Sequence, residues 1–526
     1  MNATTIRMLA PYLLGAVFLC LASVWRHFIL DDSFITYRYA ENFVWFGEVT
    51  WNIGHDPVEG FTSFAWMLVN AAGISLGLSA VLTSQAVSVG VALIMIALLC
   101  RVMRDVPVLL MIALVAALAL SPVFALHATQ GMETVFASFA YFVTVWSLLR
   151  FFETPTYRWG ALWVGVAALS FVTRPEAAIF QLPIFVVSLI LLSGGVTARR
   201  VLIRCAIPAI IFCMAYTGFR YWYFGHLFPN TFYIKGAADG LRMSGLSYMA
   251  GFFFDVLAPY LVIWLALVAF ALRHARGLLR PQCAVLAGII ALNLYLLTIL
   301  PIQGYLHRFA IPLLPSMILI TAWIARDLQL GGLTPDLSRA MKGAICALIV
   351  LVSLWPLRSW NDVSYETSIR SQDDRVMVGR ALSGLDGRMF VTEAGALPYY
   401  SGWISTDHLG LNDELIAHDG LSLDHLDAFG PDLMMALFRE PVDWSIYPVM
   451  MAHMAKNGFE PVMVNYKTNY PMAQANQQQV HIYFLDPQAE TSPEIIKRIT
   501  GIESITYLDL TPYQASFHDA VREISD

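Results

Sequence analysis

The chain alternates long apolar segments with short polar stretches. Because about twenty apolar residues cross the hydrocarbon core of a bilayer, these segments predict about eleven membrane spans, near residues 8–28, 84–103, 108–125, 133–150, 159–173, 177–195, 203–221, 255–272, 283–300, 309–325 and 342–357. Of the 526 residues, 58% are hydrophobic and 13% are charged, and the mean hydropathy is +0.61. The pattern therefore predicts an all-α, polytopic membrane domain.

Two apolar segments fit this scheme less directly. The run that follows Arg7 resembles a signal peptide, but no small-residue cleavage site precedes the acidic stretch at residue 31, so we expect it to be the first membrane helix. Residues 61–80 contain Asn70 and lack a clean charged stop, which favours a helix that lies in the membrane interface or re-enters the membrane, rather than one that crosses it fully.

Basic residues support this topology. If the N-terminus is cytoplasmic and residues 61–80 do not cross, each loop on the cytoplasmic side after the second expected span carries basic residues, as the positive-inside rule requires. These residues are Arg101, Arg104, Arg150, Arg158, Arg199, Arg200, Arg204, Arg273, Arg276, Arg280, Arg326, Arg339 and Lys342. A crossing at 61–80 would move all of these to the outside.

The composition changes after residue 358. Residues 359–526 are rich in acidic residues, contain no further membrane segment, and carry short apolar runs that predict strands at 388–393, 403–407, 461–464 and 480–485. We therefore expect a membrane domain at 1–358 and a soluble α/β or α+β domain at 359–526. An odd number of preceding spans places this second domain outside the cytoplasm.

With this topology, the unusual polar clusters gather on the extracytoplasmic face, at residues 31–32, 59, 127–134, 173–176, 226–235 and 305–309. Outward Arg and Lys residues break the positive-inside rule, and a shared anionic ligand would explain them. Guanidinium and ammonium groups bind phosphate, and the candidates are Arg38, Arg174, Lys235 and Arg308.

Asp31 and Asp32 are the candidate general bases for activating a hydroxyl group, because a water-accessible carboxylate can accept its proton. Two adjacent like charges could also raise one pKa. Together with Glu59, the pair could bind Mg²⁺ or Mn²⁺, and whether a divalent cation takes part stays open.

Each cluster also has a purely structural interpretation. The two aspartates could stop one helix and cap the next, and Asn230 could be an N-cap. Residues 174–176 could form a tight turn with a local ion pair, and Arg308 could extend to the membrane interface. Tyr233 could belong to an aromatic belt. The convergence of the clusters on one face favours the functional interpretation.

Two classes of function are disfavoured. The net charge of −6 offers no basic surface for nucleic acid. All the cysteines fall in apolar segments and none forms a CxxC motif, so we expect neither a zinc site nor a disulfide framework.

The first outer loop, at residues 31–42, 49–52 and 58–62, resembles that of the GT-C type membrane glycosyltransferases. Within this class it is most similar to the arabinofuranosyltransferases that use polyprenyl-phosphate arabinose. Further segments with this resemblance are Gly131–Thr134, Thr173–Glu176, Pro229–Lys235, Gly395–Gly402 and Asp407–Asp413.

The resemblance implies a GT-C type catalytic membrane domain with interfacial helices after its first span, and a soluble outer domain that helps to hold a glycan. It also implies a bacterial plasma or inner membrane location, a polyprenyl-phosphate sugar donor that enters from the lipid bilayer, and a cell-wall glycan or pilin acceptor. Asp31 and Asp32 would be catalytic. The residues expected around the donor are Arg38, Glu59, Arg174, Tyr233, Lys235, His307 and Arg308. Those expected at the acceptor or in the pocket are His127, Glu133, Asn230 and Asp407.

Three alternatives stay open at this point. A transferase for another sugar, such as mannose from its polyprenyl phosphate, would share all of these features. A glycolipid transporter would more commonly show internal repeats and charges in mid-membrane, which the sequence lacks. A glycan-binding scaffold would not need carboxylates and cations on the same side as its outer domain.

Overall fold

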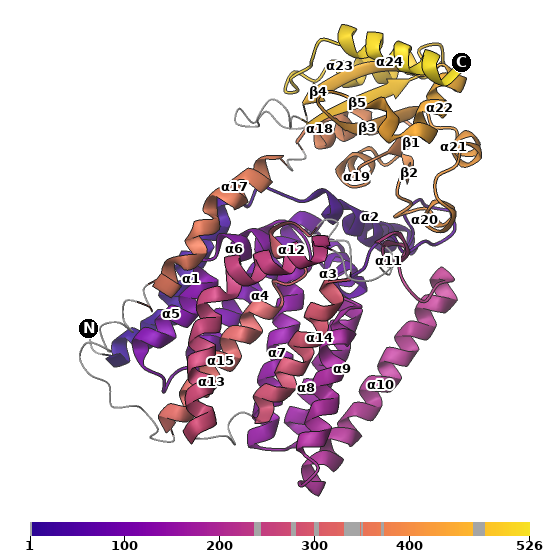
Figure 1. Cartoon of the computed structure of the whole chain (residues 1–526). Helices are drawn as coiled ribbons and strands as arrows, with labels where there is room; N and C mark the ends of the chain where they lie inside the picture. Colours follow the sequence, from indigo (N-terminus) through magenta and orange to yellow (C-terminus); the bar gives the residue numbers. More distant parts are fainter. Residues whose placement is uncertain are drawn as a thin grey trace.

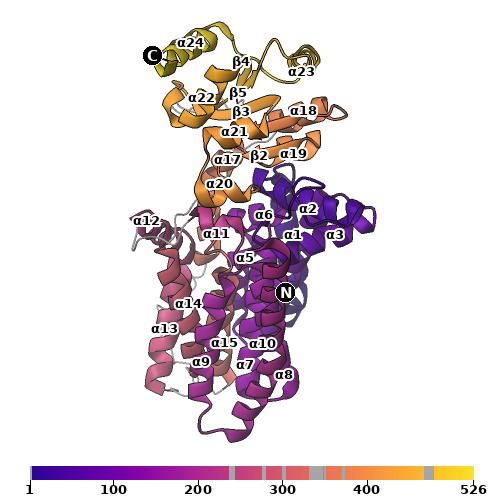
Figure 2. The same ribbon diagram turned by 90° about the vertical axis from the view of Figure 1, so that its right-hand side faces the viewer.

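The computed structural model describes residues 3–235, 243–274, 280–298, 304–330, 348, 351–369, 373–466 and 479–525. Figures 1 and 2 show a tall helical bundle beneath a smaller outer domain that contains the β-sheet. The bundle contains α1 (Ala3–Val24), α4 (Ala80–Val102), α5 (Val108–Ala119), α6 (Pro122–Thr129), α7 (Thr134–Glu153), α8 (Tyr157–Thr173), α9 (Ala177–Leu191), α10 (Val196–Phe224), the π-helix η1 (Phe252–Leu257), α13 (Ala258–His274), α14 (Arg280–Leu296) and α15 (Leu313–Leu330).

The bundle has the helices of a multi-pass membrane protein. Among the described residues, α1, α4, α7 and α10 are each long and apolar enough to cross a membrane, and the count rises to six if each of two bent pairs is one span. One of these pairs, α5 with α6, bends by 46° where Pro122 begins the second helix, since proline lacks the N–H that would continue the first.

Each span expected before residue 330 coincides with a helix or a bent pair. Three of these helices, α8, α9 and α14, fall below the length of a full span, with 17, 15 and 17 residues, so the total of about eleven stays a prediction. Half of the span expected at 342–357 lies outside the described residues.

A layer of short helices lies where the bundle meets the outer domain (Figures 1 and 2): α2 (Asp31–Phe46), α3 (Phe64–Ser75), α11 (Asn230–Lys235) and α12 (Met243–Gly251). The 12 residues of α3 span only about 18 Å, well short of the roughly 30 Å hydrocarbon core. The Ser63 side chain starts α3 by accepting a hydrogen bond from the backbone N–H of Trp66. The segment at 61–80 thus has the short helix expected of an interfacial element.

The outer domain is built on a mixed five-stranded sheet in the order β2-β1-β3-β5-β4. Strand β1 is parallel to its neighbours β2 and β3, whereas β5 is antiparallel to β3 and β4. The strands are β1 (Arg388–Val391), β2 (Ile404–Asp407), β3 (Leu433–Arg439), β4 (Glu460–Tyr466) and β5 (Gln479–Leu485). Its helices are α18 (Asp373–Leu382), α19 (Ala396–Ser401), α20 (Glu414–Asp419), α21 (Leu423–Phe429), α22 (Pro448–Asn457), α23 (Ser492–Thr500) and α24 (Thr511–Ser525).

Four of the five strands coincide with the strands predicted from the sequence, and β3 was missed. Its apolar residues run continuously, without the alternation that marks a half-buried strand, because this strand is central in the sheet and nearly all of it is buried. A short continuous apolar run does not distinguish a buried strand from a buried helix.

The connection between the two parts is the 3₁₀ helix η4 (Trp355–Ser359) followed by α17 (Trp360–Ile369). The rings of Trp360 and Trp25 have centroids 4.9 Å apart, and Val363 is buried in the core of the bundle. The boundary expected at residue 358 therefore falls inside this connection, and by packing the outer domain begins at α18.

An apolar cluster continues from the interfacial layer into the outer domain. Phe34 and Tyr37 of α2 share this cluster with Leu397 and Trp403, and all four side chains are buried. Burial of large apolar side chains stabilises by about 1.5–3 kcal/mol each. The first loop and the outer domain therefore pack as one unit.

Arg38 lies inside this interdomain contact. Its guanidinium group donates hydrogen bonds of 2.8 Å each to the backbone carbonyls of Trp51, Pro398 and Trp403, and lies 4.4 Å from the centroid of the Trp51 ring. A fourth bond of 3.2 Å reaches the side chain of Asn52. Arg38 therefore anchors the outer domain, and this correction removes it from the set of expected phosphate ligands.

Replacing Arg38 by Ala should lower the free energy of unfolding by about 3 kcal/mol, because several carbonyl groups lose a charged donor in a buried site. Thermal unfolding of the purified protein in detergent measures the change. Exposed Arg26 offers the control, since Arg26→Ala should leave the melting temperature within a degree or so of wild type. Equal melting temperatures for the two variants would contradict the anchoring role.

Candidate active site at the domain junction

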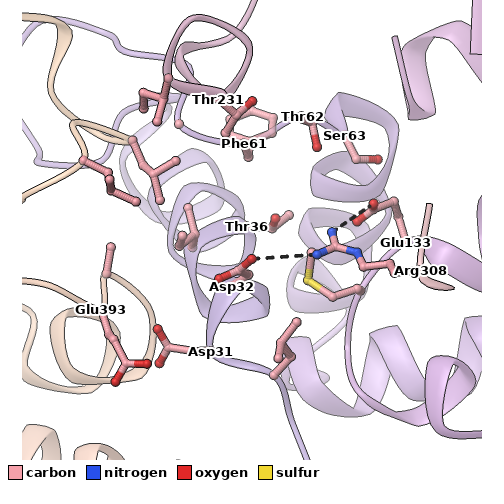
Figure 3. Close-up of a pocket in the computed structure, with 18 of the residues that line it drawn as sticks. Asp31, Asp32, Thr36, Phe61, Thr62, Ser63, Glu133, Thr231, Arg308 and Glu393 are labelled. Carbon is pink, nitrogen blue, oxygen red and sulfur yellow. Dashed lines mark hydrogen bonds and ion pairs between the residues drawn. The ribbon is translucent and has the colours of Figure 1, made fainter. Parts of the chain in front are cut away.

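An open cavity lies where the first outer loop, the bundle and the outer domain meet (Figure 3). It contains about 1060 Å³ of empty space, a volume that includes its open mouth. The described residues that line it are Leu30, Asp31, Asp32, Ile35, Thr36, Gly60, Phe61, Thr62, Ser63, Met132, Glu133, Thr231, Ile234, Arg308, Thr392, Glu393, Ala394, Leu409 and Leu411.

Asp32 and Arg308 form an ion pair in the wall of this cavity, with 3.7 Å between Oδ2 and Nη1. The other terminal nitrogen of Arg308 lies 3.4 Å from Oε1 of Glu133, and Arg174 donates to the same oxygen at 2.9 Å. Burial alone would raise the pKa of Glu133, but the guanidinium groups of Arg308 and Arg174 hold it below its ordinary value. The result is an alternating row of acids and cations.

Arg174 is the member of this row that lies farthest from the cavity. It also binds Glu176, with 2.6 Å between Nε and Oε1, and its side chain is almost completely buried. It does not line the cavity. Two carboxylates thus satisfy its charge, and it orients Glu133 instead of presenting a donor to a phosphate.

The turn before Arg308 has an unusual backbone. Leu306 and His307 both adopt positive φ angles, 47° and 59°, which side-chain-bearing residues rarely do. Buried His127 makes a contact of 3.2 Å from Nε2 to the Leu306 carbonyl, and supports this turn. His307 turns away from the site toward Asp255, at 3.4 Å, beside a second cavity. His127 and His307, both expected near the substrates, therefore support the turn that presents Arg308.

Asp31 has a different role from Asp32. Its two carboxylate oxygens each accept a hydrogen bond of 2.9 Å from the outer domain, one from the N–H of Gly395 and one from that of Ala396. Arg375 of α18 lies 3.3 Å from Oδ1. Burial raises the pKa of Asp31, against the opposing effect of the Arg375 charge. Asp31 caps the start of α19 and so holds the two parts of the protein together.

Glu59 is also committed to a buried pair. Arg220 donates to its Oε2 from Nε at 2.9 Å and from Nη2 at 2.7 Å, while burial raises the pKa of Glu59 to about 7. The Glu59 backbone carbonyl accepts a bond from the N–H of Asn230, whose side chain donates to the Gly410 carbonyl at 3.1 Å. Glu59 and Asn230 thus position the first loop against α11 and the outer domain.

Asp407, at the end of β2, organises a loop of the cavity wall. Its carboxylate accepts hydrogen bonds from the backbone N–H groups of Leu409, Leu411 and Asn412 at 3.0–3.2 Å. Burial raises its pKa to about 6, although the bonds from Leu411 and Asn412 oppose this shift. Leu409 and Leu411 line the cavity, so Asp407 shapes the wall without facing the substrate.

The last two candidates lie on α11. The Tyr233 ring packs against those of His418 and His226, with centroid distances of 4.4 and 5.7 Å. Thr231 and Ile234 of the same helix line the cavity, whereas Tyr233 does not. Lys235 closes this helix, but its side chain lies outside the described residues.

The carboxylates proposed as metal ligands do not fit a metal site as arranged. Asp31 binds two backbone N–H groups and Arg375, and Glu59 binds Arg220. Across the described ranges, no group of three His, Cys, Asp or Glu side chains lies close enough to hold a metal ion. We derive no step of the reaction through a metal.

The sequence did not point to one cavity residue of the outer domain, Glu393, or to its buried partners Arg375 and His481. They lie far apart in the chain, and no spacing links them. The one available signal was that the charged residue Glu393 ends a predicted strand, at the carboxyl end where ligands of such sheets bind.

Solved structures share this architecture. The chain is similar to ArnT from Cupriavidus metallidurans bound to undecaprenyl phosphate, with a TM-score of 0.55 and 14% identity over 90% of this chain and 97% of that chain. It is similar to the apo state of the same protein with a TM-score of 0.56, 14% identity and the same coverage. The archaeal oligosaccharyltransferase AglB from Archaeoglobus fulgidus, in complex with an inhibitory peptide and a dolichol-phosphate, gives 0.55 and 10% identity over 88% of this chain and 73% of that chain. These similarities establish that the fold is of the GT-C type.

Sequence comparisons add less. A family model described as Domain of unknown function (DUF8728) matches residues 363–492, which cover most of the outer domain and its connection to the bundle. No curated protein sequence matches the chain.

A substitution at Gly395 tests the contact between Asp31 and the outer domain. A Cβ atom at this position would lie 2.1 Å from the backbone oxygen of Asp31, so Gly395→Ala should separate the outer domain from α2 and lower stability by about 1–3 kcal/mol. Melting temperature and protease sensitivity of the connection at α17 measure this effect. A Cβ on Gly218 of α10 would meet nothing within 4 Å, so Gly218→Ala should be neutral or slightly stabilising.

Asp407 should make stability depend on pH. Its pKa of about 6 exceeds the value of about 3.9 in an unfolded chain, so its contribution is complete below pH 4 and is lost as the pH rises through 6. The free energy of unfolding should fall by about 3 kcal/mol over this range, and Asp407→Asn should remove that part of the slope. Denaturant unfolding of both proteins between pH 4 and pH 7 measures it; parallel curves would show that Asp407 does not titrate there.

Proposed function

We propose that this protein is a membrane glycosyltransferase that moves a sugar from a polyprenyl-phosphate donor to a hydroxyl group of an extracytoplasmic acceptor. The observation that carries this proposal is the Asp32–Arg308 pair in a cavity open between the bundle and the outer domain. A carboxylate and a guanidinium group 3.7 Å apart provide a base and a phosphate ligand for one reaction.

Arg308 is the residue best placed to bind the donor phosphate. Among the described residues that line the cavity it is the one Arg or Lys, and its side chain is 5% exposed. A guanidinium group that is largely shielded from water stabilises the negative charge that develops on a leaving phosphate. Electrostatic stabilisation of this kind is usually the largest part of catalysis. ArnT, which shares the fold, was crystallised with undecaprenyl phosphate, and this supports a lipid-phosphate ligand here.

Asp32 then acts on the acceptor. The acceptor oxygen forms a bond to the anomeric carbon of the donor sugar, and the bond from that carbon to the phosphate oxygen breaks. The hydroxyl proton passes to the Asp32 carboxylate, and the polyprenyl phosphate leaves with the bonding electron pair and is held by Arg308.

The sugar, the acceptor and the orientation complete the proposal. The resemblance of the first loop, at residues 31–42 and 58–62, to that of the arabinofuranosyltransferases favours D-arabinofuranose as the sugar, with a bacterial cell-wall glycan or pilin as acceptor. The distribution of basic loops favours an inner-membrane protein with a cytoplasmic N-terminus, which places the cavity and the outer domain outside the cytoplasm.

Asp32→Asn should lower kcat by about 10²–10⁴-fold, because the amide cannot accept the proton. Binding of undecaprenyl phosphate should be retained. Transfer from synthetic polyprenyl-phosphate arabinofuranose, with the mannose analogue in parallel, measures both activity and sugar preference.

Two variants separate the roles in this experiment. Arg308→Gln should weaken undecaprenyl phosphate binding as well as turnover, since it removes the charge that meets the phosphate. Asp56→Asn, an exposed site in the same outer loop, should match wild type. Full turnover by Asp32→Asn would remove this carboxylate from the mechanism.

A further inference from the structure

The outer domain presents the carboxyl ends of its parallel strands to the cavity. Residues 392–394 directly follow β1, and Leu409 and Leu411 follow the parallel neighbour β2; all of them line the cavity. Ligands of open α/β sheets bind outside the carboxyl ends of the strands. The outer domain is therefore arranged as one wall of the site.

Glu393 is the charged residue of that wall. Figure 3 shows its carboxylate beside that of Asp31, with Asp32 between these two residues and Arg308. The Glu393 side chain is 17% exposed, so it is held by the protein and still reaches the cavity. The cavity thus has a guanidinium group on its bundle side and a carboxylate on its outer side.

A buried polar chain fixes Glu393. Its Oε2 lies 2.5 Å from Nη1 of Arg375 and 2.6 Å from Nε2 of His481. The other ring nitrogen of His481 is bonded to Asp374, and the side chains of His481 and Arg375 are completely inaccessible. Burial would lower the pKa of His481, but the Asp374 and Glu393 carboxylates more than offset this effect and raise it.

This arrangement exceeds what domain contact requires. Asp31 already joins the two parts through Gly395, Ala396 and Arg375. Burying further charged groups costs free energy, and a contact made of apolar side chains would often be at least as stable. A carboxylate that is held this firmly at the edge of a cavity is suited to orient a ligand.

On the basis of the proposed function, we infer that Glu393 binds the acceptor, and that the acceptor group it receives is an uncharged polyhydroxyl group. The carboxylate accepts a hydrogen bond from a hydroxyl next to the one that reacts, so that the reacting hydroxyl lies against Asp32. His481 is a positioning residue, which acts through Glu393. The donor occupies the Arg308 side and the acceptor the Glu393 side.

The charges around the cavity determine the class of acceptor. Its described lining has four carboxylates, Asp31, Asp32, Glu133 and Glu393, and one guanidinium group, that of Arg308. Of the nearby cations, Arg375 and His481 are paired with acids on the outer side, and Arg174 with acids on the bundle side. An acidic acceptor would bring a further negative charge next to the Asp31 and Glu393 carboxylates, whose neighbouring cations are already paired, whereas sugar hydroxyls donate hydrogen bonds to carboxylates.

The test uses the purified full-length protein, polyprenyl-phosphate arabinofuranose as donor, and two oligosaccharides that differ only in a terminal neutral sugar or its uronic acid. Glu393→Gln should raise the KM for the neutral acceptor about 10- to 100-fold, as expected for loss of a hydrogen bond to a charged group. The KM for the donor and the affinity for undecaprenyl phosphate should stay within about threefold of wild type. The preference for the neutral over the acidic acceptor should fall.

Further variants separate binding from folding. Tyr399→Phe removes another interdomain hydrogen bond, to Glu41, outside the cavity lining, and should leave both KM values unchanged. Glu393→Asp keeps the charge but withdraws the carboxylate, and should raise the acceptor KM about as much as Glu393→Gln does while the donor KM stays unchanged. It should also lower the melting temperature, because Arg375 and His481 lose contacts in a buried site. His481→Gln should also raise the acceptor KM. In the Glu393→Gln background it should have little further effect on this KM, since the two residues act as a unit.

An unchanged acceptor KM in Glu393→Gln would overturn this inference and leave the proposed function intact. An equal rise in the KM values for donor and acceptor would do the same, because it would indicate general distortion of the cavity. If wild-type protein transferred no sugar from either polyprenyl-phosphate donor, the proposed function and this inference would fail together.

Discussion

The structure depends on the contact between α2 and the outer domain, where buried charged groups find partners far away in the chain. Arg38 donates to the carbonyls of Pro398 and Trp403, and Asp31 accepts from the N–H groups of Gly395 and Ala396. A buried charge without partners costs several kcal/mol. The first outer loop and the outer domain therefore depend on each other, although more than 300 residues separate them in the sequence.

This contact also separates the roles of the two adjacent aspartates. Successive residues of a helix point about 100° apart, so once Asp31 faces the outer domain, Asp32 turns toward the cavity and Arg308. The structural and the chemical interpretation of the pair both apply, one to each residue. Since Asp31 fixes the start of α2, the direction of Asp32 is set by a neighbour that takes no part in the proposed reaction.

The sequence predicted the features that depend on local pattern: the apolar helices, most of the sheet and a set of polar clusters between the helices, while the outward orientation of these clusters and the interfacial position of 61–80 stay predictions. The structure brings Asp32, Glu133 and Arg308 from that set into one cavity. It assigns Arg38, Glu59 and other members to supporting contacts. A sequence shows which residues carry charge and on which side they lie, but not which partner each one finds. Pairs such as Arg220 with Glu59 are 161 residues apart, and burial of both partners decides their role.

The ion pairs near the cavity differ in the distance between their charged atoms, and this difference affects how donor binding would change the proposed base, Asp32. Arg174 and Glu133 are 2.9 Å apart, and Arg375 and Glu393 2.5 Å, whereas Arg308 and Asp32 are 3.7 Å apart. Asp32 is also the more exposed partner, at 24%. A phosphate that entered the site would displace Asp32 from Arg308. This pair is the loosest of the three, so breaking it would cost the least free energy, since Coulomb attraction falls with distance and with solvent access. Arg308 would then bind the donor at the moment when Asp32 loses its cation, and a carboxylate without a nearby cation is a stronger base. Under the proposed function, arrival of the donor would itself prepare the base for the acceptor.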